Sequence, residues 1–219
     1  MIPIRSVFAA VIPAYNERYS IVDVIEGTKL YAFPIVIDDG SSDITAQLAS
    51  QSGALVVSHQ SNMGYDATLQ TGLFKAIELG YTFAITIDAD RQHDPATLEL
   101  FKMELLKGAD LVVGVRDRKQ RFSESLFGHI TELIWSVSDP LCGMKGYRLS
   151  HLKRAGYFDS YKSIGTEYLL RCLRSGLKVS SVPVLTQDRF HLSRFGHGLK
   201  PNFLILRAML LGFIKAKRF

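Results

Sequence analysis

Cysteine is scarce in this sequence, and its scarcity excludes several kinds of site. Cys142 and Cys172 are the two cysteines among 219 residues, and they do not form a C-x-x-C pair. A zinc knot and a dithiol redox centre are therefore not indicated, and a reducing compartment is expected. We expect both thiols to be small packing groups.

Long hydrophobic runs are also missing. No apolar stretch approaches the roughly 20 residues that a membrane-spanning helix needs. The apolar stretch after Arg5 is cut short at Pro13 and has no small-residue cleavage site. We therefore expect a first strand there rather than a signal peptide.

The common phosphate-binding loops are absent as well. Neither G-x-G-x-x-G nor G-x-x-x-x-G-K-[ST] occurs in the sequence, which disfavours dinucleotide-dependent dehydrogenases and P-loop enzymes. The formal net charge of +5 nevertheless suggests an anionic partner, such as nucleic acid, phosphates or membrane headgroups. If the protein binds nucleotide phosphates, a metal ion and basic side chains have to neutralise them.

Short apolar segments alternate with segments of helical spacing through the first half of the chain. This order is typical of βαβ units and predicts an α/β fold with a parallel sheet. Because no linker or internal repeat interrupts the chain, we expect a single domain over residues 1–219. The predicted strands cover residues 7–12, 34–37, 54–57, 81–87 and 110–115.

The second half has a looser pattern. We predict a helix over residues 166–175, a strand over 178–185 and a terminal helix over 203–219. Pro183 places that strand near an edge of the sheet, because proline cannot donate a ladder hydrogen bond. The segment 138–150 is expected to be rich in turns.

Polar clusters follow four of the predicted strands. They are NER at 16–18, DDGSSD at 38–43, DADRQHDP at 88–95 and VRDR at 115–118. Ligands of parallel sheets bind beyond the carboxyl ends of the strands, so we expect the clusters to converge on one crevice.

The DADRQHDP cluster favours a metal ion. In an extended segment, Asp88 and Asp90 point to the same side, about 7 Å apart, and repel each other unless a cation lies between them. Mg²⁺ and Mn²⁺ bind carboxylate and phosphate oxygens together, and Gln92 could add an amide oxygen. The simpler alternative is that the acids cap the next helix, which we favour for Asp94 because it directly precedes Pro95.

The DDGSSD cluster leaves two interpretations open. Asp38 and Asp39 follow a strand, and Gly40 permits a tight turn after them. The two acids are either solvated groups where a helix begins or acceptors of hydrogen bonds from a base or ribose.

Several motifs together carry a resemblance to a known family. In their order and spacing, VIPAYNE, VIDDGSSD, NMGYDATLQTG and TIDADRQHDP resemble glycosyltransferase family two. Farther along, SDPLCGMKGYR, IGTEYLLRCLRSGLKVSSVPV and DRFHLSRFG resemble its polyprenyl-phosphate branch, which includes dolichyl-phosphate mannose synthases. The resemblance spans roughly residues 7–198.

The resemblance implies the GT-A fold, a mostly parallel central sheet flanked by helices. It implies a Rossmann-like nucleotide-sugar-binding half over residues 1–115 and an acceptor-binding half over 116–198. A basic amphipathic helix over 199–219 then completes the single domain.

The resemblance also implies an inverting transfer from a UDP- or GDP-sugar donor that depends on Mg²⁺ or Mn²⁺. Asp88 and Asp90 would form the D-x-D motif that holds the metal on the diphosphate, with Gln92 as a further ligand. The residues implied along the nucleobase are Pro13, Tyr15 and Glu17, with Asp39 beside them.

Basic residues are implied at the phosphates. Arg116 corresponds to an arginine that contacts phosphate, and Arg121 is a further candidate. Arg189, Ser193 and Arg194 belong to a basic loop that closes over the donor and acceptor phosphates. The alternative is that these arginines lie on a solvated face.

One segment departs from the family pattern. Related enzymes carry N-x-G-K-G-x-A after the third strand, whereas residues 62–67 read NMGYDA, so Tyr65 and Asp66 replace a lysine and a glycine. Because this segment lies near the donor in the family, the resemblance does not identify the sugar.

The acceptor decides the mechanism. A sugar hydroxyl needs a general base, and Asp139 matches the position of that base in hydroxyl-using relatives. A phosphate monoester is already anionic and needs none. The DPLCGMKGY context and the basic loop favour polyprenyl phosphate over a hydroxyl on a lipid-linked or cell-surface glycan. Asp139 then organises the acceptor site, and the catalytic residues are Asp90, Arg116 and Asp139.

The terminal helix bears on the location of the protein. A basic amphipathic helix either binds a membrane surface or packs on the core with a basic end at its C-terminus. We expect a cytoplasmic protein that is peripheral at the inner face of the membrane. A nucleotide- or nucleic-acid-binding module without transfer activity is disfavoured, because the acids of the crevice would repel a polyphosphate backbone. No nucleic acid partner is therefore expected.

Overall fold

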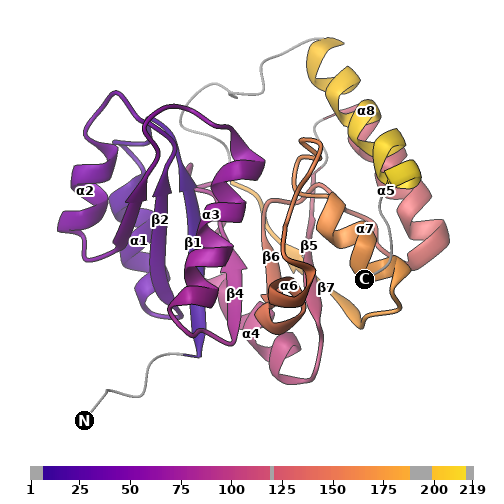
Figure 1. Cartoon of the computed structure of the whole chain (residues 1–219), viewed down its shortest axis with the longest axis horizontal. Coiled ribbons are helices and arrows are strands. Elements are labelled where there is room, and N and C mark those ends of the chain that lie inside the picture. Colours follow the sequence, from indigo (N-terminus) through magenta and orange to yellow (C-terminus); the bar gives the residue numbers. More distant parts are fainter. Residues whose placement is uncertain (1–6, 119–120, 188–198, 216–219) are drawn as a thin grey trace.

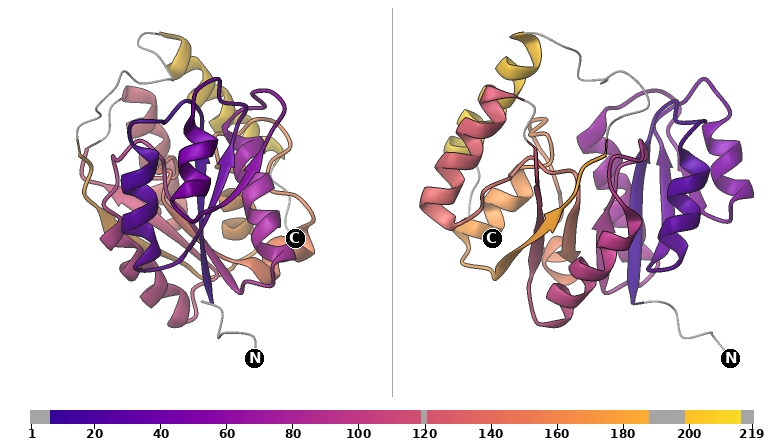
Figure 2. Two further views of the ribbon diagram at one scale, coloured as in Figure 1. Left: turned by 90° about the vertical axis from the view of Figure 1, so that its left-hand side faces the viewer. Right: turned by 180° about the vertical axis from the view of Figure 1, so that it is seen from behind.

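The structure, a computed structural model, describes residues 7–118, 121–187 and 199–215 of the chain (Figure 1). Over these residues the strands form a seven-stranded sheet in the order β3-β2-β1-β4-β6-β5-β7. Helices cover both faces of this sheet (Figure 2). The predicted α/β class with a mostly parallel sheet is confirmed.

Strand direction divides the sheet. β3, β2, β1 and β4 are parallel to one another, and β5 is parallel to β7. β6 is antiparallel to both of its neighbours, β4 and β5. β7 lies at an edge of the sheet, as its proline predicts. The strands are β1 (Phe8–Ala14), β2 (Phe33–Asp38), β3 (Leu55–Ser58), β4 (Phe83–Thr86), β5 (Leu111–Arg116), β6 (Lys145–Arg148) and β7 (Val179–Val184).

The helices form layers on the sheet. Those on one face are α1 (Ile21–Lys29), α2 (Thr45–Gln51) and α4 (Leu98–Leu106). Those on the other face are α3 (Tyr65–Glu78), α6 (Leu149–Ala155) and α7 (Glu167–Arg174). α5 (Phe122–Trp135) and α8 (Leu199–Lys215) lie side by side at the right of Figure 1. There the rings of Trp135 and Phe213 stack with centroids 5.8 Å apart.

The two faces of the sheet carry separate buried cores, which is why β1 and β2 are continuous apolar runs. Ile12 packs in the core with α1, while Val11 and Ile37 pack in the core with α3. Helix α3 lies very close to these strands: a Cβ at Gly72 would be 2.3 Å from Cγ1 of Val11. This contact fixes α3 with its N-terminus at the carboxyl ends of β1 and β2.

Two predictions about local structure have clear outcomes. Asp94 does cap a helix: its Oδ1 accepts a hydrogen bond from the Ala96 N–H at 2.9 Å, at the start of the 3₁₀ helix η1 (Pro95–Thr97). The terminal helix begins at Leu199, the first residue of the expected segment 199–219 and four residues before the helix predicted over 203–219, and residues 216–219 lie outside the described part of the chain.

The expectation of a turn-rich segment over 138–150 is wrong for its second half, which contains β6 and the start of α6. The four residues of β6 include a lysine and a glycine, so they lack the apolar alternation that predicts a strand. Because β6 runs antiparallel between β4 and β5, the residues before it lie between the carboxyl ends of those two strands.

Candidate active site

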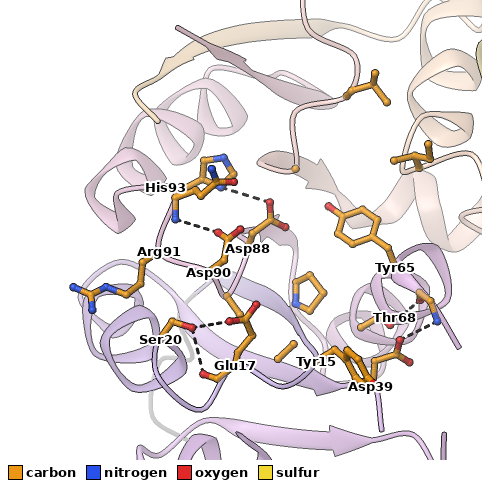
Figure 3. Close-up of a pocket in the computed structure, with 18 of the residues that line it drawn as sticks. Tyr15, Glu17, Ser20, Asp39, Tyr65, Thr68, Asp88, Asp90, Arg91 and His93 are labelled. Atoms are coloured by element: carbon orange, nitrogen blue, oxygen red, sulfur yellow. Dashed lines mark hydrogen bonds and ion pairs between the residues drawn. The ribbon is translucent and has the colours of Figure 1, made fainter. Parts of the chain in front are cut away.

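A cavity of about 1100 Å³ opens at the carboxyl ends of the parallel strands (Figure 3). Side chains from all four polar clusters line it, as the sequence predicts. The lining residues from these clusters are Asn16, Glu17, Asp39, Asp88, Asp90, Arg91, Gln92, His93, Arg116 and Arg118.

The loop after β4 presents carboxylates to this cavity. The side chain of Asp88 is 25% exposed, and Asp90 accepts a hydrogen bond from the Gln92 N–H at 3.1 Å. Arg91, which directly follows Asp90, has a φ of 63° and turns its guanidinium away from the two acids, where it pairs with Asp23 at 2.7 Å (Figure 3). This left-handed residue keeps a competing cation out of the acidic site.

Contacts with later parts of the chain hold this loop in place. The Gln92 carbonyl accepts a hydrogen bond from the Gln187 N–H at 2.9 Å, and His93 forms an isolated bridge with Thr186. Gly143, just before β6, lies against Asp88: a Cβ there would be 2.3 Å from the Asp88 Oδ2. The position of the Asp88 carboxylate therefore depends on a glycine at 143.

His93 is a further polar group beside the acids. It is buried, and its Nδ1 lies 3.8 Å from Oδ2 of Asp88 with no hydrogen-bond partner in the described part of the chain. A buried polar atom without a partner costs roughly 1–3 kcal/mol, so this site is suited to a further polar ligand such as a water molecule.

The acidic loop fits a metal that is shared with a substrate. No three His, Cys, Asp or Glu side chains of the described residues form a ready-made metal cage. Mg²⁺ is commonly held by one or two carboxylates, with substrate phosphates and water completing its octahedron. Asp88 and Asp90 supply such a pair, and Gln92 lines the same cavity.

The residues implied along the nucleobase lie together on another side of the cavity. Pro13, Tyr15 and Glu17 follow β1, and Asp39 follows β2. Asp39 is buried and fixes the loop before α3, because its carboxylate accepts hydrogen bonds from Met63 N–H at 2.8 Å and Gly64 N–H at 2.9 Å.

Arg116 and Asp139 form a buried ion pair. Asp139 is 1% exposed, and its carboxylate receives the Arg116 Nε at 2.7 Å, the Nη2 at 2.8 Å and the backbone N–H at 3.1 Å. Burial lowers the pKa of Arg116, but the hydrogen bond and charge of Asp139 outweigh it and hold this pKa above its ordinary value. Asp139 itself is not among the described residues that line the cavity, so Arg116 separates it from a ligand.

Glu124 was not predicted from the sequence. This buried carboxylate on α5 binds Arg116 at 3.2 Å and Arg121 at 2.9 Å, and it holds both guanidinium groups at the cavity. Its only sequence signal is the three-residue spacing from Arg121. The predicted phosphate contacts Arg189, Ser193 and Arg194 lie outside the described residues.

Asp66 ties α3 to the second half of the chain. Its carboxylate accepts hydrogen bonds from the backbone N–H groups of Ile164 at 3.1 Å and Gly165 at 2.6 Å. Burial is the main reason that its pKa rises from 3.8 to about 6, and the charge of Asp159 adds to the rise. The two N–H donors and the charge of Lys145 oppose this shift.

Sequence comparison identifies relatives of this chain. The family model of glycosyl transferase family 2 matches residues 9–164, more than half of the chain. A UDP-N-acetylglucosamine–dolichyl-phosphate N-acetylglucosaminyltransferase of Methanococcus voltae is 26% identical over 239 residues, covering 92% of this chain and 94% of that protein. A polyprenol monophosphomannose synthase of Mycolicibacterium smegmatis is 33% identical over 116 residues, covering 48% of this chain and 43% of that protein. The predicted family resemblance is confirmed.

Structural comparison agrees with the family match. Glucosyl-3-phosphoglycerate synthase of Mycobacterium tuberculosis, solved with Mn²⁺, UDP and glucosyl-3-phosphoglycerate, has a TM-score of 0.76 and 21% identity, covering 95% of this chain and 79% of that one. The same enzyme with Mg²⁺ and UDP has a TM-score of 0.75 and 23% identity, covering 93% of this chain and 78% of that one. These similarities confirm the predicted GT-A fold.

The shifted pKa of Asp66 predicts a pH dependence of stability. Its folded-state pKa of about 6 lies above the ordinary value of 3.8, so the folded state binds the proton more tightly. The free energy of unfolding of the wild type, relative to Asp66→Asn, should fall by about 2 kcal/mol as the pH rises from 4 to 7. Urea denaturation of both proteins across this range measures the difference, and a difference independent of pH would contradict the assignment.

The contact between Gly143 and Asp88 predicts a steric effect on ligand binding. Gly143→Ala should displace the Asp88 carboxylate and weaken Mn²⁺-dependent UDP binding by about tenfold or more, as measured by calorimetry. Gly146→Ala on β6 is the control, since its Cβ would meet the side chains of Leu105 at 3.0 Å and Phe101 at 3.3 Å and not Asp88. Equal UDP affinity of the two variants would show that Asp88 is not held by this contact.

Proposed function

We propose that this chain, which belongs to glycosyl transferase family 2 and is a glycosyltransferase, transfers a sugar from a nucleotide-diphosphate sugar to polyprenyl phosphate. UDP- and GDP-sugars are the donors that we consider, and Mg²⁺ or Mn²⁺ is the cofactor. Asp88 and Asp90, with Gln92, would hold the metal, which neutralises the leaving diphosphate when it is bound.

The observation that carries this proposal is the opposition of charges across one cavity. Asp88 and Asp90 line it beside Arg116, Arg118 and Arg121. Carboxylates alone would repel a diphosphate, and arginines alone would not favour a diphosphate that carries a metal ion. The presence of both groups therefore fits a metal–diphosphate complex. Pro13, Tyr15, Glu17 and Asp39 would then contact the nucleoside end of the donor.

The Arg116–Asp139 pair supports a phosphate acceptor. Asp139 could take a proton from a sugar hydroxyl only by giving up a buried ion pair, which is strongly destabilising. A phosphate oxygen can attack the anomeric carbon without a base. The new C–O bond then forms opposite the breaking bond to the diphosphate, which leaves with the electron pair, and the configuration inverts. Arg116 and Arg121 would bind the acceptor phosphate, and Asp139 would orient Arg116.

Two relatives support the same acceptor class, since their names specify dolichyl phosphate and polyprenol. The alternatives are transfer to a sugar hydroxyl with Asp139 as base, and a nucleotide-binding module without transfer activity. Both are tested by the same assay. Wild-type protein is incubated with Mn²⁺, undecaprenyl phosphate and UDP-glucose, UDP-N-acetylglucosamine or GDP-mannose, and the glycosylated lipid phosphate is measured.

Asp139→Asn separates the phosphate acceptor from the hydroxyl acceptor. We expect the variant to raise the KM for undecaprenyl phosphate and to keep kcat within about tenfold of the wild type, since loss of a general base reduces the rate by roughly 100-fold or more. Asp110→Asn is the control, because it neutralises a carboxylate that also pairs with an arginine, Arg148 at 3.2 Å, but does not line the cavity. A collapse of kcat with unchanged UDP binding would make Asp139 the base and overturn the proposal.

Helix α8 supports action at a membrane surface. The side chains of Phe203, Leu206, Leu210 and Ile214 are exposed, and their spacing places them on one stripe of the helix. The charged residues of α8 are all cationic, and it contains no Asp or Glu. None of the described helices is both long and apolar enough to cross a membrane. We therefore propose peripheral binding of α8 to anionic lipids, at the cytoplasmic face where we expect the protein.

The orientation of α8 joins this stripe to the active site. Leu204 and Ile205, which lie outside this exposed stripe, line the cavity. A lipid phosphate in the bilayer beneath α8 would therefore lie close to the arginines.

Leu210→Glu tests the membrane surface. Burial of a leucine side chain contributes roughly 1.5–3 kcal/mol, so the variant should lower the affinity for phosphatidylglycerol vesicles by at least about tenfold in sedimentation assays. Leu30→Glu is the control, since Leu30 is 78% exposed at the end of α1, away from this helix. Equal vesicle binding by both variants would exclude α8 as the contact.

A further inference from the structure

Tyr65 places an unused hydrogen-bond donor in the active-site cavity. It is the first residue of α3, and its hydroxyl points across the cavity toward Asp88 (Figure 3). In the described part of the chain this hydroxyl has no hydrogen-bond partner. The ordinary pKa of a tyrosine phenol is about 10, so this hydroxyl is a neutral donor at pH 7.

Ile164 extends the same wall of the cavity. It lines the cavity with a φ of 57°, a left-handed conformation that is a clear outlier for a β-branched residue. Its neighbour Gly165 lies against the phenol, since a Cβ there would be 3.7 Å from Cε1 of Tyr65. The two side chains therefore belong to one continuous surface.

The surrounding hydrogen bonds hold Ile164 in this strained conformation. Asp66 binds the backbone N–H groups of Ile164 and Gly165. Asp159 binds those of Lys162 at 2.7 Å and Ser163 at 2.8 Å. A strained backbone conformation persists only where the surrounding structure fixes it. Residues in such conformations are concentrated at ligand contacts.

We infer that Tyr65 and Ile164 form the wall that selects the transferred sugar, with the Tyr65 hydroxyl donating to an oxygen of that sugar and Ile164 packing against its ring. The inference rests on the proposed function, which puts the diphosphate at Asp88 and Asp90 and the acceptor phosphate at Arg116. The sugar is joined to the diphosphate and must lie between these two sites, next to Asp88. The Tyr65 phenol lines the cavity at this place. Because it is a neutral hydrogen-bond donor, it is better suited to bind an oxygen of a sugar than to neutralise a phosphate.

The test compares nucleotides with and without a sugar. Dissociation constants are measured by calorimetry with Mn²⁺ for UDP, UDP-glucose and UDP-N-acetylglucosamine, and for GDP, GDP-glucose and GDP-mannose. Tyr65→Phe should weaken binding of the nucleotide sugar that the wild type prefers by roughly three- to tenfold, the effect of one lost hydrogen bond, and leave the free nucleotide unchanged. Tyr81→Phe is the matched control, because Tyr81 stacks on Phe33 and does not line this cavity.

A second variant probes the apolar part of the wall. Ile164→Ala should change the ratio of affinities for the two sugars on the preferred nucleotide by at least about threefold, with the free nucleotide bound as in the wild type. If Tyr65→Phe weakens the free nucleotide as much as the nucleotide sugar, or weakens neither, the inference is overturned and the proposed function stands. If the wild type binds none of these nucleotides with Mn²⁺, the proposed function fails and the inference fails with it.

Discussion

The antiparallel strand β6 is the constraint on which the active site depends. It lies between β4 and β5, so its first residues and the segment before it are placed between the carboxyl ends of those two strands. One side of this segment meets the acids after β4, where Gly143 contacts Asp88. The other side meets the end of β5, where Asp139 pairs with Arg116. A single strand thereby sets both the acidic and the basic groups of the cavity.

Electrostatics explains how the basic and the acidic side chains of the cavity are held in place. Asp139 and Glu124 neutralise the guanidinium groups of Arg116 and Arg121, which would otherwise be partly buried and uncompensated. Each arginine has N–H groups in addition to those donated to the carboxylates, because a guanidinium carries five. A phosphate can therefore bind without displacing the carboxylates. The acidic loop has no equivalent set of cations within it, since Arg91 turns outward, so its charge stays available for a metal ion.

Much of this arrangement could be predicted from the sequence. The parallel strands, the edge position of β7, the cap at Asp94 and the convergence of the polar clusters all follow from local patterns. The position of β6 did not follow, because a strand of four residues with a lysine and a glycine has no periodic signal. The partners of Asp139, Asp66 and Glu124 are long-range contacts that no local spacing encodes, apart from the short step from Arg121 to Glu124. The family resemblance predicted residue roles, but not the burial of Asp139 behind Arg116.

The wall beside Asp88, formed by Tyr65 and Ile164, contains or adjoins two features that lower the stability of the fold. Asp66 is ionised at neutral pH although burial opposes it, and Ile164 is held in a left-handed conformation that its side chain disfavours. Both features concern one connection between α3 and the loop before α7. Neither feature is needed to fill the core. An apolar residue at position 66 would avoid the cost of a buried charge, and a glycine at position 164 would avoid the backbone strain. Unfavourable features of this kind persist where a surface has to keep a particular shape, and this surface faces the cavity. The residues that depart from the family pattern, Tyr65 and Asp66, thus lie at the wall where we propose that the sugar is selected.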